Sequence, residues 1–107
     1  MIDGRLSIDA QIEDSSTTLT LAGEVDPQTT EQLDQAVDGA LEASANLVLD
    51  LGGVTFIDSA GLRSLIRAQR RTEQDGGSLV LRSPRPSTLR VLEITGLTDE
   101  LTVELSD

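Results

Sequence analysis

One serine hydroxyl in this chain lies at a position where covalent modification could change the local charge. An apolar run ends in Asp58 and Ser59, and a helical pattern of apolar residues starts immediately afterwards. Ser59 is thereby predicted in the first turn of a helix, where backbone N–H groups lack intrahelical partners and the helix dipole is positive. The fold would tolerate a phosphate there, which adds about −1.5 to −2 charges. The alternative is plain capping, in which Asp58 caps the helix and Ser59 only fills its first turn.

A second acidic position, Asp26, follows an earlier alternating run that ends in Gly23-Glu24-Val25. Loops that begin helices gather along one edge of a sheet with crossover connections, so we expect Asp26 and Asp58 to lie close together and flank Ser59. Two unrelated helix caps would give the same pattern. A Mg²⁺ or Ca²⁺ site made of carboxylates alone is conceivable, but no loop has a recognisable ligand spacing. We therefore predict no metal site.

The residue types that are missing restrict the possible chemistry. The chain has no histidine, cysteine or lysine, and all eight basic residues are arginine. These absences exclude a Ser-His-Asp triad, cysteine nucleophiles, Schiff-base chemistry and the lysine of a phosphate-binding loop. Zinc and other transition metals lose their usual nitrogen and sulfur ligands. We therefore expect a protein that is not an enzyme, with no catalytic residues and no cofactor.

The formal net charge of −11 limits the partners. Such a surface repels nucleic-acid phosphates and anionic membranes, and the single aromatic residue, Phe56, leaves no platform for stacking bases. We expect neither nucleic acid nor membrane as a partner. Basic residues gather on the helical segment after Ser59, where they form either a solvated face or a docking surface. They are Arg63, Arg67, Arg70 and Arg71.

The spacing of apolar residues predicts strands and helices in alternation. Runs at 5–12 and 19–25 predict a β-hairpin, and Gly23 indicates a bulge or a close backbone approach. A helix is expected to open at Asp26 and Pro27. The dense apolar run at 46–51 predicts a central strand, covered on both faces and broken by the two glycines that follow. The remaining patterns predict a helix at 59–75, a strand at 79–81, a helix that stops at Gly96 and a strand at 101–105.

This order, β-β-α-β-α-β-α-β, belongs to the α/β class and predicts a mixed sheet with helices packed against it. The 107 residues show no linker or repeat, so a single domain over 1–107 is expected. No apolar run approaches the roughly 20 residues that span a bilayer, and the first residues do not resemble a signal peptide. We therefore expect a cytoplasmic protein.

Taken together, the motifs resemble the STAS-domain family, and within it the anti-sigma factor antagonists. The segment 21–26 is similar to that family's strand followed by Gly-Glu-Leu/Val-Asp. Asp58-Ser59-Ala60-Gly61-Leu62 is similar to its phosphorylation loop, and 94–97 to its late Gly-Leu turn. Ala60 departs from the pattern, because members often have a second serine or threonine there. Ser59 is intact.

The resemblance implies a phosphoserine switch in bacterial transcription. The unmodified protein would bind an anti-sigma factor that is also a serine kinase, and a sigma factor would be freed. The kinase would phosphorylate Ser59 with ATP and release the protein, and a regulatory serine phosphatase would reset it. By this resemblance, Asp26 lies beside the serine and helps recognition or phosphorylation. We expect the partner-binding residues to be Asp26, Asp58, Ser59, Ala60, Gly61 and Arg63.

A different kind of STAS protein is also similar to this chain. Subunits of lipid-transporting ABC complexes resemble it, with Asp-Thr/Ser-Ala-Gly-Leu at the same place, so Ala60 fits them. The partner would then be the transporter ATPase. The Gly-Glu-Val-Asp segment at 23–26 favours the antagonist. The sequence leaves the oligomeric state open between a monomer and a weak dimer.

Overall fold

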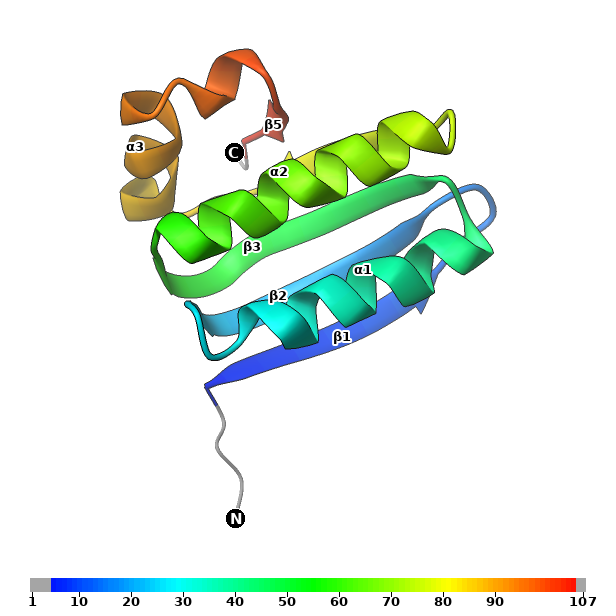
Figure 1. Ribbon diagram of the computed structural model, residues 1–107, viewed down its shortest axis with the longest axis horizontal. Helices are drawn as coiled ribbons and strands as arrows, with labels where there is room; N and C mark the ends of the chain where they lie inside the picture. The colour runs from blue at the N-terminus through cyan, green and yellow to red at the C-terminus, as the bar shows by residue number, and fades with distance from the viewer. Residues whose placement is uncertain (1–4, 106–107) are drawn as a thin grey trace.

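The computed structural model describes residues 5–105, and its helices and strands follow the predicted order (Figure 1). The strands are β1 (Leu6–Ile12), β2 (Thr17–Val25), β3 (Asn46–Ile57), β4 (Ser78–Arg82) and β5 (Thr102–Glu104). The helices are α1 (Thr30–Ala43), α2 (Ser59–Gln74), α3 (Pro86–Ile94) and the short 3₁₀ helix η1 (Leu97–Asp99), which the sequence did not predict.

One mixed sheet holds the five strands in the order β1-β2-β3-β4-β5. β1 and β2 pair as an antiparallel hairpin, and every later pair of neighbours is parallel. Parallel neighbours need crossover connections, which the helices supply. The carboxyl ends of β2 and β3 lie along one edge of the sheet, where α1 and α2 begin (Figure 1). The predicted α/β class and mixed sheet are confirmed.

The core lies between the sheet and the pair α1 and α2, which run side by side over one face (Figure 1). Fully burying one leucine or valine stabilises the fold by about 1.5–3 kcal/mol before the cost of ordering it. The buried strand residues on this side include Leu19, Leu21, Leu47, Leu49, Leu51, Leu79 and Leu81. The two helices contribute Leu33, Val37, Ala40, Leu41, Leu62, Leu65 and Ala68.

The opposite face of β3 is less covered than the sequence predicts. Burial alternates in the first half of the strand, where Leu47, Leu49 and Leu51 are buried and Val48 and Asp50 are only half-buried. The expected coverage of both faces is therefore wrong. An unbroken apolar run does not separate a residue such as Val48, which contacts its neighbours in the sheet, from one that a second layer of helices covers.

β3 also continues through Gly52 and Gly53, where a break was expected. The register against β2 shifts there, which accommodates the glycines as an irregularity of the strand. A second shift lies beside Gly23, whose φ is +118° and whose missing Cβ would stand 2.0 Å from the carbonyl oxygen of Arg5. Gly23 thus marks both a bulge and a close backbone approach, as predicted.

The first helix starts later than predicted. α1 begins at Thr30, and Asp26 to Thr29 form a turn in which the N–H groups of Thr29 and Thr30 both donate to the Asp26 carbonyl oxygen at 3.0 Å. Asp26 is therefore not the residue before the helix. Its side chain accepts from the N–H of Gln28 at 2.9 Å, the local pattern by which aspartate builds a turn.

The helix that begins at Ser59 agrees with its prediction closely. α2 spans Ser59–Gln74 and is followed by Gly76 at φ +77°. Gly96, at φ +78°, ends the α3 segment and begins η1, and Leu97 after it is buried. None of the helices in residues 5–105 is both long and apolar enough to cross a membrane.

Candidate functional site

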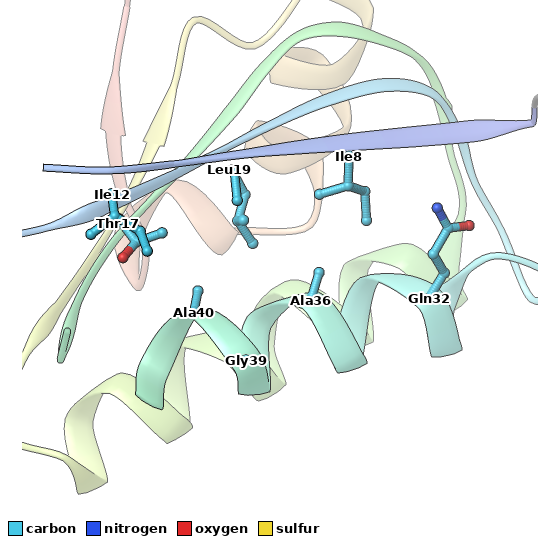
Figure 2. Close-up of a pocket in the computed structure, with 9 residues that line it drawn as sticks. Ile8, Ile12, Thr17, Leu19, Gln32, Ala36, Gly39 and Ala40 are labelled. Atoms are coloured by element: carbon cyan, nitrogen blue, oxygen red, sulfur yellow. The ribbon is translucent and has the colours of Figure 1, made fainter. Parts of the chain in front are cut away.

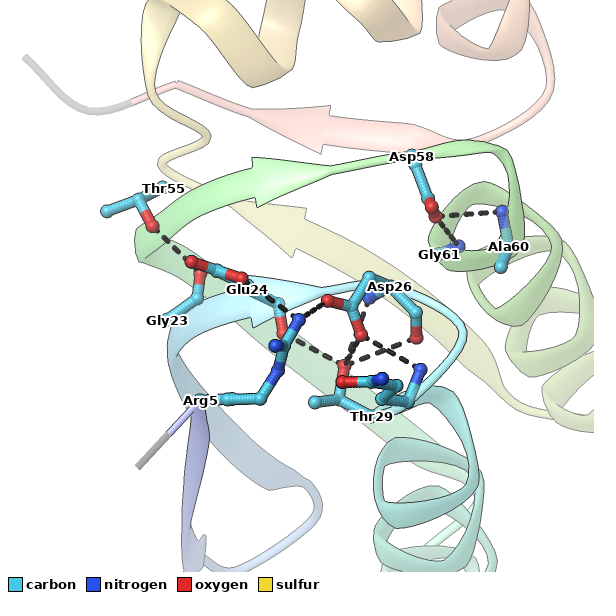
Figure 3. A network of polar contacts seen from close by, with 10 residues as sticks. Arg5, Gly23, Glu24, Asp26, Thr29, Thr55, Asp58, Ala60 and Gly61 are labelled. Atoms are coloured by element: carbon cyan, nitrogen blue, oxygen red, sulfur yellow. Dashed lines mark hydrogen bonds and ion pairs between the residues drawn. The ribbon is translucent and has the colours of Figure 1, made fainter. Parts of the chain in front are cut away.

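Ser59 is the first residue of α2, and its side chain is exposed. Asp58 is the N-cap of this helix, and its Oδ1 accepts from the backbone N–H groups of Ala60 at 3.0 Å and Gly61 at 3.1 Å (Figure 3). The predicted capping role of Asp58 is confirmed. The same bonds correct one expectation, because two N–H groups that would have faced an added phosphate are already occupied by a carboxylate.

The cap gives a testable consequence for stability. Asp58→Ala is expected to lower the free energy of unfolding by about 1 kcal/mol, because two first-turn donors lose their acceptor. Urea unfolding followed by circular dichroism measures this change. Asp75→Ala is the matched control: it removes an exposed carboxylate at the C-cap of the same helix, where no side-chain cap bond is lost. Equal effects of the two changes would contradict the capping role.

Gly61 allows the first turn of α2 to approach the ends of β2 and β3. A methyl group there would stand 2.6 Å from Ile57 Cγ1 and 2.9 Å from both Cγ1 and the carbonyl oxygen of Val25. Leu62, the next residue, is buried in the core. Three residues of the Asp58–Leu62 motif therefore have a structural role: Asp58 caps α2, Gly61 lets the helix pack closely on the strands, and Leu62 is part of the core. The Ser59 side chain makes no hydrogen bond with any residue that the structure describes.

Asp26 is held at the same edge of the sheet as Asp58. Val25 pairs with Ile57, and the N–H of Asp58 donates to the carbonyl oxygen of Val25 at 3.2 Å. Asp26 is buried, with 6% of its surface exposed, and its carboxylate forms an ion pair with Arg5. The two loops are therefore brought together as predicted. Their carboxylates have different partners, since that of Asp26 binds Arg5 and its own turn and that of Asp58 caps α2 (Figure 3).

The alternative of a carboxylate metal site finds no support in this arrangement. Within residues 5–105, no group of three or more acidic side chains is placed so that it could hold a metal ion. The Arg5 guanidinium, which also binds Glu24 at 3.1 Å, supplies the positive charge beside Asp26.

The four arginines of α2 separate into two kinds. Arg67 Nη2 lies 3.1 Å from Asp38 Oδ2, and Arg71 Nη1 lies 2.6 Å from Asp38 Oδ1, so both hold α2 to α1. These two side chains therefore form ion pairs with α1 while they stay partly exposed, with 40% and 35% of their surface accessible. Arg63 and Arg70 are exposed, and neither forms an ion pair within residues 5–105. Arg63 borders a polar hollow of about 330 Å³ between the first turns of α1 and α2.

Phe56, which sequence reasoning did not assign to the site, is a surface residue near the carboxyl end of β3. Half of its surface (50%) is exposed, although it is the sole aromatic residue of the chain. It borders a small hollow of about 170 Å³ together with Ser87, Thr88 and Val91 of α3. The feature of the sequence that could have drawn attention to Phe56 was its position three residues before Ser59. Alternation alone gave no reason to place it at the surface, because the register shifts just before it.

An apolar hollow of about 430 Å³ lies between β1 and α1 (Figure 2). Its walls include Ile8, Leu19, Ala36 and Ala40, and Gln32 donates to the Leu6 carbonyl oxygen at 3.0 Å. Most of the residues that line this hollow are apolar, and none of them carries an ionisable side chain. It is not lined by Ser59 or by either aspartate discussed above.

The chain is similar to known proteins over most of its length. A family model described as "Mlab, STAS domain" matches residues 8–105. The anti-sigma-B factor antagonist of Bacillus subtilis is 28% identical over 94 residues, which are 88% of this chain and 86% of that protein. The crystal structure of an anti-sigma factor antagonist from Mycobacterium paratuberculosis is 26% identical, with a TM-score of 0.80 over 94% of this chain and 86% of that one. An anti-sigma-factor antagonist (STAS) domain protein from Planctomyces limnophilus, 21% identical, has a TM-score of 0.79 over 94% of this chain and 91% of that chain, and it supports the fold alone.

Proposed function

The chain belongs to the STAS-domain family, and on that premise we propose that it is an anti-sigma factor antagonist switched by phosphorylation of Ser59. The names of its relatives support the antagonist function. The observation that supports the switch is that Ser59 is exposed and free of hydrogen bonds to other residues of 5–105, while Asp58, Gly61 and Leu62 beside it are needed by the fold.

In this proposal the unphosphorylated protein binds an anti-sigma factor serine kinase and thereby frees a sigma factor. The partner contacts Ser59, Ala60 and Arg63 on the first turns of α2, where the Ser59 and Arg63 side chains are exposed. Asp58 and Gly61 act by fixing where that surface lies. Asp26 is mostly buried, so it contributes chiefly by holding the neighbouring loop.

Phosphorylation acts on the complex rather than on the fold. The kinase transfers the γ-phosphoryl group of ATP to Ser59 Oγ, which loses its proton, and ADP leaves. The added charge of about −1.5 to −2 lies at an exposed position beside the Asp58 carboxylate. A partner that packed over it would have to bury that charge, which costs about 2–5 kcal/mol. A regulatory serine phosphatase then returns the protein to its binding form.

The cellular setting follows from the same proposal. The antagonist, the kinase and the sigma factor would meet in the bacterial cytoplasm. The chain itself contributes no catalytic group, because the kinase and the phosphatase perform both chemical steps.

The proposal is tested by capture from a lysate of the source cell, with the parent protein and Ser59→Ala as baits. We expect both baits to retain a small ATP-binding protein kinase. Added ATP should release the kinase from the parent and not from Ser59→Ala, because only the parent offers the acceptor hydroxyl. Mass spectrometry of the released parent should place the phosphate on Ser59. Release from both baits alike, or a phosphate elsewhere in the chain, would overturn the switch.

A second candidate is a subunit of a lipid-transporting ABC complex. The matching family model carries the name Mlab, which is not the name of the antagonists, and Ala60 in place of a second hydroxyl fits this reading. In that case both baits would retain a transporter ATPase, and ATP would not release it in a way that depends on Ser59. The same capture experiment therefore distinguishes the two candidates.

A further inference from the structure

Ser59 begins a line of residues along α2 at intervals of four, followed by Arg63, Arg67 and Arg71. Residues four apart on a helix are neighbours, with about 5–6 Å between their Cβ atoms. The line therefore places a guanidinium group one turn after the hydroxyl and two more on the turns beyond it.

The two distant arginines are already neutralised by α1. Arg67 and Arg71 share the Asp38 carboxylate, and Arg67 Nη1 also lies 3.8 Å from Asp34 Oδ1. Arg5, a further cation at this edge of the sheet, binds Asp26 and Glu24. Arg63 is exposed and has no ion pair within the described chain, although it borders the same polar hollow as Asp34. Arg63, one turn after Ser59, is thus a cation without an ion pair among the described residues.

We propose that Arg63 binds the phosphate on Ser59 within the same chain, an inference that rests on the proposed phosphorylation of this serine. The Asp58 carboxylate occupies the N–H groups of Ala60 and Gly61, so the backbone leaves the phosphate few donors. A guanidinium group at the fourth following residue can supply two parallel N–H donors to phosphate oxygens. The charged groups near this pair are the Asp58 carboxylate at the N-cap of α2, Asp34 on α1 and Arg67 on α2, the last two of which line the same hollow as Arg63.

The consequence is that one modification changes the docking surface twice. Phosphorylation adds negative charge at Ser59, and it also draws the Arg63 guanidinium away from the partner and onto the phosphate. Any acidic group of the partner that binds Arg63 in the unphosphorylated complex loses that cation at the same time. Arg63 is therefore a residue that sets how sharply the phosphate separates bound from free.

The test uses the full chain with phosphoserine placed at position 59 during translation, so that no kinase is needed. The ³¹P titration midpoint of the phosphate is measured in the parent, Arg63→Gln and Arg70→Gln. Arg70→Gln is the matched control, since it removes from the same helix an exposed arginine that has no ion pair within residues 5–105 and that lies roughly 16 Å from Ser59 along the helix axis. Arg63→Gln should raise the midpoint by about 0.3 pH units, because a nearby cation favours the dianion.

Arg70→Gln should move the midpoint by much less than Arg63→Gln, and Arg63→Lys should retain most of the parental value. Equal midpoints for Arg63→Gln and Arg70→Gln would overturn the pairing. This result is separate from the fate of the proposed function. If Ser59 were never phosphorylated in the cell, the capture experiment would fail while the titration would still show whether Arg63 binds a phosphate placed there.

Discussion

Ser59→Glu is expected to weaken binding of the captured kinase by roughly 30-fold to several-thousand-fold, which corresponds to about 2–5 kcal/mol. The reason is desolvation, because the substitution places a carboxylate where the partner would otherwise pack over a small hydroxyl group. The exposed Arg63 lies one turn after this position, and the Asp58 carboxylate lies next to it. Ser59→Ala should bind with an affinity close to that of the parent.

Titration calorimetry with the purified partner measures this difference. Ser15→Glu is the matched control, because it introduces the same charge at an exposed serine in the β1–β2 turn. That turn lies at the end of the sheet opposite to Ser59, since Thr17 pairs with Leu47 and Val25 with Ile57. Ser15→Glu should leave binding nearly unchanged. If it weakened binding as much as Ser59→Glu, the effect would come from the net charge of the chain and not from the first turn of α2.

The same substitution should leave the fold intact. Ser59 is exposed and caps nothing, and an acidic residue in the first turn of a helix interacts favourably with the helix dipole. Thermal unfolding of Ser59→Glu is therefore expected within about 0.5 kcal/mol of the parent. If Ser59→Glu lost much stability, its weaker binding would be a result of unfolding and not of the added charge.

Gly61→Ala is expected to have the largest effect on stability among the motif residues, a loss of about 2 kcal/mol in the free energy of unfolding. The new methyl group would stand 2.6 Å from Ile57 Cγ1 and 2.9 Å from the carbonyl oxygen of Val25. The backbone of β2 cannot move aside at this point, because the same oxygen accepts from the Asp58 N–H. The first turn of α2 must therefore shift, and the cap and Ser59 shift with it.

Gly39→Ala provides the matched control for this change. Gly39 lies inside α1, and apart from its chain neighbours and the nearby backbone of the same helix no atom comes within 4 Å of where its Cβ would be. Alanine should therefore stabilise the protein by about 0.5–1 kcal/mol, since it loses less conformational freedom in a helix than glycine. Urea unfolding of both variants measures the pair. If Gly61→Ala stabilised the protein as Gly39→Ala does, the close approach of α2 to β2 and β3 would be disproved.

The local features of the site could be predicted from the sequence because they depend on neighbours along the chain. A cap satisfies N–H groups two and three residues later, so Asp58 before a helical pattern was enough to predict its role. The same logic failed at Asp26, where an aspartate before a proline builds a turn as readily as it caps a helix. A turn and a helix cap at Asp26 differ by only a few local hydrogen bonds. The turn is also held by an ion pair between Asp26 and Arg5, which is 21 residues away in the sequence.

By itself, then, the sequence determined the order of strands and helices, the mixed sheet, and a lone hydroxyl on the first turn of a helix, because periodicity and capping act within a few residues. Only the tertiary structure decided which groups remain available. It pairs Arg67 and Arg71 with Asp38 across 29 and 33 residues and buries Asp26 against Arg5. It leaves Phe56 half-exposed next to α3 and Arg63 exposed one turn after Ser59. The physical reason is that ion pairs and burial depend on which elements pack together, and a residue's own neighbours in the chain do not encode that contact.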